Sequence, residues 1–223
     1  MPPITDGLDA ARGLEESGIM GLQIDLAAIV ANWKALAAGL GIGLAAIFGW
    51  EGYQGSRESR ALQASQIYDD LQTARSDGAV DEVSRMADTL AREFDGSPYA
   101  ALAKLQQAGL ALDRGDLDAA RGALAWVADN SGDAGLLALA NLRLARVDFE
   151  RGQLEAALSR LSTQPQGFES LYLEMRGDVL LAQGDRSGAH DAYRDALAAL
   201  DPAAPNRLLL QFKIDDLADV VQS

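Results

Sequence analysis

The chain has 223 residues and a formal charge of −14, from 33 acidic and 19 basic side chains. This acidic excess argues against a nucleic-acid binder, because phosphate recognition needs a basic face. Cysteine is absent and histidine occurs once, which excludes a disulfide framework, thiolate chemistry and a multi-histidine metal cluster. Six prolines and 6% aromatic residues are typical of an all-helical protein.

The amino-terminal residues predict a tail and a membrane anchor. Glycine, proline and acidic side chains interrupt residues 1–23, so we expect a disordered tail there. Residues 24–33 have the pattern of a short amphipathic helix, and residues 35–50 then carry no charge. A helix of those sixteen residues would span ~24 Å, slightly less than a ~30 Å hydrocarbon core.

Aromatic residues stand at both ends of this apolar run, with Trp33 and Lys34 before it and Trp50 and Tyr53 after it. Such a belt is typical of a spanning helix. We therefore predict a transmembrane helix at about 35–53, within an anchor of residues 24–54. A buried core helix and a cleaved signal peptide are the alternatives. Glycine-rich helices form poorly in water, and the run begins late for a signal peptide.

Small residues recur every four positions in the same run, at Ala37, Gly41, Ala45 and Gly49. This spacing gives a flat stripe that another helix can approach closely, so we predict transmembrane helix packing there. The alternative is that glycine and alanine are simply common in such helices. Basic residues on both sides of the run leave its orientation undecided.

The rest of the chain contains an internal repeat. Three segments align without gaps: RGDLDAA at 114–120, RGQLEAA at 151–157 and QGDRSGA at 183–189. Their glycines Gly115, Gly152 and Gly184 lie 37 and 32 residues apart, close to the period of about 34 in tetratricopeptide repeats. A looser copy surrounds Gly78.

Side-chain size follows the same register. Seven residues before the glycines stand Ala108, Ala145 and Gly177; five after stand Ala120, Ala157 and Ala189; nine after stand Leu124, Leu161 and Tyr193. Small side chains permit two helices to cross closely, and the large one fills the space toward the next pair. We predict helices near 58–75, 80–94, 98–113, 117–128, 134–150, 154–161, 168–182, 186–199 and 206–221. Residues 55–223 would thus form a tetratricopeptide-repeat-like solenoid with a carboxy-terminal capping helix.

The first helix of each pair should line a groove. The candidate partner-binding residues there are Leu105, Leu142, Arg146, Phe149, Leu171 and Glu174. The positions of a chaperone-type carboxylate clamp lack its Lys and Asn, so an apolar groove for an extended hydrophobic peptide or a partner helix is expected. Alternatively the last helix fills the groove, although we expect it to lie beyond.

No constellation of residues predicts catalysis. His190 is interpreted as an exposed helical histidine, because a catalytic histidine needs a nucleophile and a pocket and neither is identifiable. We therefore expect no enzyme, no catalytic or cofactor-binding residue, no metal site and no small-molecule substrate.

The layout resembles the YfgM-like proteins of Gram-negative bacteria over most of the chain from about residue 24. The most specific stretches are FGW at 48–50, LRLARV at 142–147, RGDVLLAQGD at 176–185 and LLQFKIDDL at 209–217. The resemblance implies a single-pass inner-membrane protein with a cytoplasmic amino terminus and a periplasmic repeat domain. It also implies association with the SecYEG translocon and the periplasmic chaperone PpiD, and a role with unfolded secretory or outer-membrane clients.

One departure concerns the stretch before the apolar run, which is basic and aromatic in the family but reads LAAIVANWK at 26–34 here. Orientation therefore rests on the likeness rather than on charge. The leading hypothesis is a membrane-anchored adaptor at the translocon, which tethering would keep concentrated where chains emerge. The alternative is a membrane-tethered scaffold for another cell-envelope assembly.

Overall fold

The computed structural model describes residues 33–217, although the side chains of several residues between 33 and 56 fall outside that description. The predicted tail and most of the short amphipathic helix before Trp33 lie outside the described residues. The chain divides into two units, Met1–Ser56 and Arg57–Ser223. The second unit contains the repeats.

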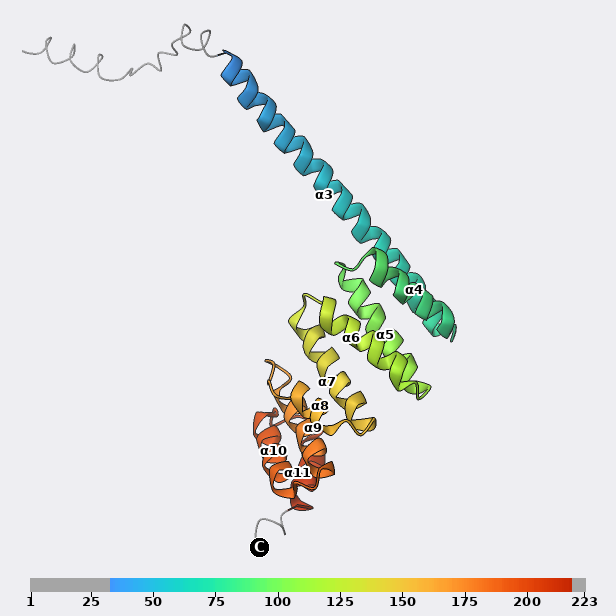
Figure 1. Cartoon of the computed structure of the whole chain (residues 1–223), viewed down its shortest axis with the longest axis vertical. Helices are drawn as coiled ribbons and strands as arrows, with labels where there is room; N and C mark the ends of the chain where they lie inside the picture. The colour runs from blue at the N-terminus through green and yellow to red at the C-terminus, as the bar shows by residue number, and fades with distance from the viewer. Residues whose placement is uncertain (1–32, 218–223) are drawn as a thin grey trace, which may run out of the picture. The chain divides into compact units, whose positions relative to one another are not determined.

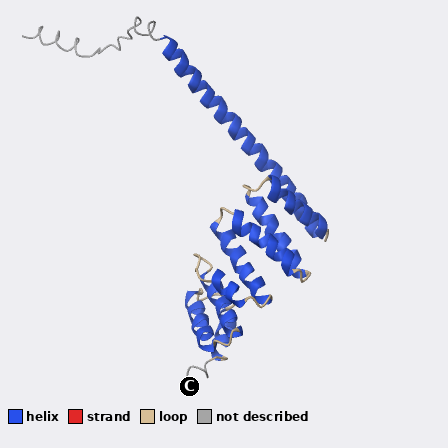
Figure 2. Cartoon of the chain, viewed as in Figure 1, coloured by secondary structure: helices blue, strands red, loops and turns tan. Residues whose placement is uncertain are grey.

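Figures 1 and 2 show that the described residues form helices joined by short turns. The helices are α3 (Trp33–Ser76), α4 (Val80–Glu93), α5 (Pro98–Asp113), α6 (Leu117–Asn130), α7 (Ala134–Glu150), α8 (Leu154–Arg160), α9 (Glu169–Ala182), α10 (Arg186–Ala199) and α11 (Arg207–Asp215). The ends of α4 to α10 fall within two residues of the predicted ones. The prediction of an all-α, tetratricopeptide-repeat-like array is confirmed.

Helix α3 differs from the prediction, because it runs without a break through residues assigned to both the anchor and the first repeat helix. None of the helices in the described part of the chain is long and apolar enough to cross a membrane. The spanning helix predicted at about 35–53 stays a prediction, because several side chains of that segment lie outside the described residues.

The turn glycines end the first helix of each pair in the same way. Gly115 and Gly152 both have φ +74°, in the left-handed region that other residues enter only at a cost. The amide of Gly115 donates to the carbonyl of Leu112 at 2.9 Å, and that of Asp116 donates to Ala111 at 2.9 Å. This pair of bonds is a Schellman motif, which satisfies the last carbonyls and reverses the chain. The same arrangement occurs at Gly78 and Gly184.

Side-chain volumes are complementary where the two helices of a pair cross. The buried residues seven before and nine after the turn glycine combine one small and one large side chain: Ala108 with Leu124, Ala145 with Leu161, Gly177 with Tyr193 and, in reverse order, Leu71 with Ala87. The ring of Tyr193 lies where a side chain at 177 would be. Small residues were predicted at this crossing, but the large residue was expected to fill the space toward the next pair, whereas the Tyr193 ring also fills the crossing within its own hairpin. The first repeat has the sizes exchanged.

Helix α11 and the turn that follows it pack on the α9–α10 pair through Leu210, Ile214 and Leu217, which are buried with Tyr193. It leaves Leu208, Leu209 and Phe212 exposed on its other side. The described helix ends at Asp215, earlier than predicted. It lies beyond the groove between α7 and α9 and caps the last hairpin, as expected.

Candidate functional site

The first helices of the third and fourth repeats, α7 and α9, enclose a hollow of about 290 Å³. Its lining residues are Leu142, Arg143, Arg146, Leu171, Glu174, Met175 and Asp178. Four of the six predicted partner-binding residues, Leu142, Arg146, Leu171 and Glu174, therefore lie together. They do so because the repeat register places equivalent positions of neighbouring first helices side by side.

The other two predicted groove residues lie elsewhere. Leu105 is only 7% exposed and belongs to the core formed with α6 and α7, so it supports the array instead of lining a groove. Phe149 is half-buried against the cluster around Leu161 and Tyr172. Both residues differ from the prediction because side chains of other helices cover them. The helical spacing of residues within one helix does not show which of them another helix will cover.

Ion pairs involve three of the four charged residues that line the hollow, Arg146, Glu174 and Asp178. Arg146 Nε donates to Glu150 Oε1 at 3.2 Å, and its Nη1 lies 3.9 Å from the Met175 sulfur. Lys213 on α11 donates to Glu174 Oε1 at 2.8 Å and to Asp178 Oδ1 at 2.7 Å. Burial by itself would lower the pKa of Lys213, but the hydrogen bonds to the two carboxylates outweigh it and raise that pKa.

Arg143 and Met175 are lining residues that sequence reasoning missed, and Asp178 also lines the hollow although it is not among the six candidates. Arg143 directly follows Leu142, and Met175 directly follows Glu174. On each helix, the residue that follows a predicted position therefore also lines the hollow. Among the side chains that the structure describes, none forms a hydrogen bond or an ion pair with Arg143 at the rim of this hollow.

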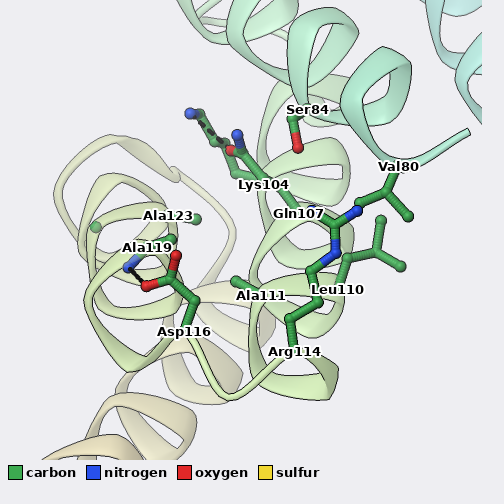
Figure 3. A pocket seen from close by; sticks show the side chains of 11 residues that line it. Val80, Ser84, Lys104, Gln107, Leu110, Ala111, Arg114, Asp116, Ala119 and Ala123 are labelled. Carbon is green, nitrogen blue, oxygen red and sulfur yellow. Dashed lines mark hydrogen bonds between the residues drawn. The ribbon is translucent and has the colours of Figure 1, made fainter.

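A second hollow of about 400 Å³ lies among α4, α5 and α6 (Figure 3). Alanine and glycine on α6 leave the space open, and Lys104 and Gln107 of α5 lie beside each other at its edge. Lys104 donates to Asp88 at 2.6 Å and to Gln107 at 2.9 Å, so its charge is already balanced. This hollow contains none of the predicted site residues.

His190 is buried, at 8% exposed, which corrects the expectation of an exposed histidine. It directly follows Ala189, which packs in the core of α9, α10 and α11. Its Nδ1 lies 3.4 Å from Asp191. Within residues 33–217, no group of three or more histidine, aspartate and glutamate side chains is placed to hold a metal ion.

The hairpins, their turn glycines and the hollow between first helices define a helical repeat protein of the tetratricopeptide class. The sequence profile of the tetratricopeptide repeat-like domain matches residues 30–219. The crystal structure of MamA superposes with a TM-score of 0.55 at 16% identity, covering 68% of this chain and 84% of that one, which supports the fold alone.

Curated relatives share most of the sequence. A protein of Escherichia coli (strain K12) is 34% identical over 189 residues, which are 84% of this chain and 90% of that protein. A protein of Neisseria gonorrhoeae is 31% identical over 171 residues, 76% of this chain and 82% of that protein. Both are named ancillary SecYEG translocon subunit, and neither is named as an enzyme. The chain belongs to the family of ancillary SecYEG translocon subunits.

Proposed function

We propose that this protein is an accessory subunit of the SecYEG translocon that holds other polypeptides in the groove between α7 and α9. The observation that carries the proposal is the similarity to ancillary translocon subunits over 84% of the chain, which includes the groove. Stacked hairpins suit this role because they present side chains of several repeats to one ligand. We further propose a PpiD-like periplasmic chaperone and unfolded client chains as partners.

The proposed location is the inner membrane, with the repeat domain on the periplasmic side and the amino terminus in the cytoplasm. Residues 24–54 would provide the attachment, and residues 24–32 of that segment lie outside the described part of the chain. Ala37 and Gly41 are exposed, and a Cβ at Gly39, Gly41 or Gly43 would meet no atom within 4 Å. This open surface supports helix packing against a membrane partner along the stripe that continues to Ala45 and Gly49.

Site-specific photocrosslinking in native membranes tests the partner. A photoreactive residue replaces Leu171, which is 44% exposed at the hollow, and a control probe replaces Arg194, which is exposed on α10. We expect adducts with SecYEG subunits or the chaperone from position 171 and fewer from position 194. Adducts with a different envelope complex would favour the alternative scaffold role, and equal adducts from both positions would refute the groove.

Sidedness is tested separately, since the chain has no natural cysteine. Asp77→Cys places a single thiol in the exposed turn between α3 and α4. We expect a membrane-impermeant maleimide to label it in intact spheroplasts. Labelling that occurs only after lysis would place the repeat domain in the cytoplasm instead.

A further inference from the structure

The hollow between α7 and α9 has a charge pattern that its own ion pairs leave unbalanced. Arg143 contributes one positive charge, and within the described residues no carboxylate pairs with it. Glu174 and Asp178 contribute two negative charges but share the single ammonium group of Lys213. Because Arg146 is neutralised by Glu150, the α7 helix is left positive at the hollow and the α9 helix negative.

Apolar side chains also line the hollow. Leu142 comes from α7, and Leu171 and Met175 come from α9, with Leu171 at 44% exposure. The volume of about 290 Å³ is just below the roughly 300–1,000 Å³ that ligand pockets occupy. Such a space suits one anchoring side chain of a segment rather than the whole face of a helix.

We propose, on the basis of the proposed function, that the hollow binds an internal, extended polypeptide segment with one apolar side chain between an acidic and a basic residue. The apolar side chain occupies the space beside Leu142 and Leu171. The acidic residue pairs with Arg143, and the basic residue pairs with the carboxylates of Glu174 and Asp178. An internal segment supplies both charges from the side chains on either side of the anchor and needs no free chain terminus.

The direct test measures binding of fluorescent peptides to the full-length chain in mild detergent by anisotropy. The peptides have blocked ends and carry Asp–Leu–Lys, Asn–Leu–Gln or Lys–Leu–Lys in an otherwise identical sequence. We expect the Asp–Leu–Lys peptide to bind best, and Arg143→Glu to weaken it about tenfold, as for the loss of one partly buried charge pair. Arg194→Glu makes the same charge change on exposed α10 and should leave binding unchanged.

The reversed pair gives the decisive comparison. Arg143→Glu should bind the Lys–Leu–Lys peptide more tightly than the unmodified protein does, which general destabilisation would not produce. The proposal is overturned if Arg143→Glu weakens all three peptides equally, if it weakens none, or if binding needs a free terminal carboxylate. Photocrosslinking from position 171 separates a failure of this proposal from a failure of the proposed function. If one of these three peptide results occurs and the translocon adducts still form, the charge pattern is refuted and the proposed function stands. If no translocon adducts form, the proposed function is refuted.

Discussion

Replacing Gly177 by alanine tests the packing between the two helices of the last hairpin. A Cβ at this position would meet three ring carbons of Tyr193, the farthest of which, Cζ, lies at 3.0 Å. The ring has little freedom to move away, because Tyr193 is 1% exposed and its hydroxyl donates to Asp178 at 2.8 Å. Lys213 also lies over the ring, 5.2 Å from its centre.

Two effects of opposite sign determine the size of the change. Alanine in a helix interior is more stable than glycine by about 0.5–1 kcal/mol. Overpacking of a filled core costs about 1–3 kcal/mol, and a displaced Tyr193 hydroxyl would lose a hydrogen bond worth about 0.5–1.5 kcal/mol. We therefore expect Gly177→Ala to lower the free energy of unfolding by about 1–3 kcal/mol, or roughly 2–4 °C in Tm for each kcal/mol.

Urea and thermal unfolding followed by circular dichroism measure this difference. Gly109→Ala is the matched control, because Gly109 also lies within a helix but its Cβ would meet no atom within 4 Å. The control should be slightly more stable than the unmodified protein. If Gly177→Ala were as stable as Gly109→Ala, the interpretation of Gly177 and Tyr193 as a complementary pair would be refuted.

The double variant Gly177→Ala, Tyr193→Leu recreates the pairs of the second and third repeats, Ala108 with Leu124 and Ala145 with Leu161. It should recover most of the stability that Gly177→Ala loses, short of the hydrogen bond to Asp178. Additive losses in the double variant would show that the two positions do not share one packing space.

Three further variants probe the joints of the array by denaturation. Asp148 is fully buried and accepts from Arg121 at 3.3 Å and from Arg160 at 2.7 Å, so Asp148→Asn should cost about 1–3 kcal/mol; an unchanged urea midpoint would contradict this. Gly152→Ala should lower the free energy of unfolding by about 1–2 kcal/mol, because the backbone φ of Gly152 is +74°. Gly132→Ala is the control and should leave the free energy of unfolding nearly unchanged. The pKa of Lys213 is raised in the folded protein, so its contribution to stability is fully present below the unfolded pKa of about 10.4 and is lost as pH rises above that value toward the folded pKa. Lys213→Gln should therefore flatten the fall in stability above about pH 10, and an unchanged pH profile would contradict this.

Much of the fold could be predicted because it depends on local and periodic properties of the chain. The turn glycines are needed for a left-handed backbone, and the small and large residues around them are needed for the crossing of the two helices. The first repeat shows where the pattern weakens. Leu71 and Ala87 exchange the sizes, so the volume sum is kept although the residue types differ from the other repeats. The sequence predicts two helices, at about 35–53 and 58–75, where the structure has the single helix α3. The residues between them contain no clear helix-ending signal, so the sequence does not distinguish one long helix from two.

The groove residues were only partly predictable for a related reason. Helical spacing identifies which residues share a face, and it found Leu142, Arg146, Leu171 and Glu174. It does not reveal what the next hairpin covers, and so it placed Leu105 in the groove and left His190 exposed. Nothing in the sequence distinguishes Arg143 from the other arginines, because the tertiary structure decides whether a carboxylate lies close enough to form an ion pair with it.

The sequence by itself determined the succession of helices, the positions of the reversals and the family, since each depends on residues near in the chain or on similarity along it. The tertiary structure decided which side chains of α7 and α9 meet around one hollow. It also decided that Lys213, thirty-nine residues from Glu174 along the chain, balances part of its charge. Burial and charge compensation are properties of neighbours in space, which packing of the hairpins brings together.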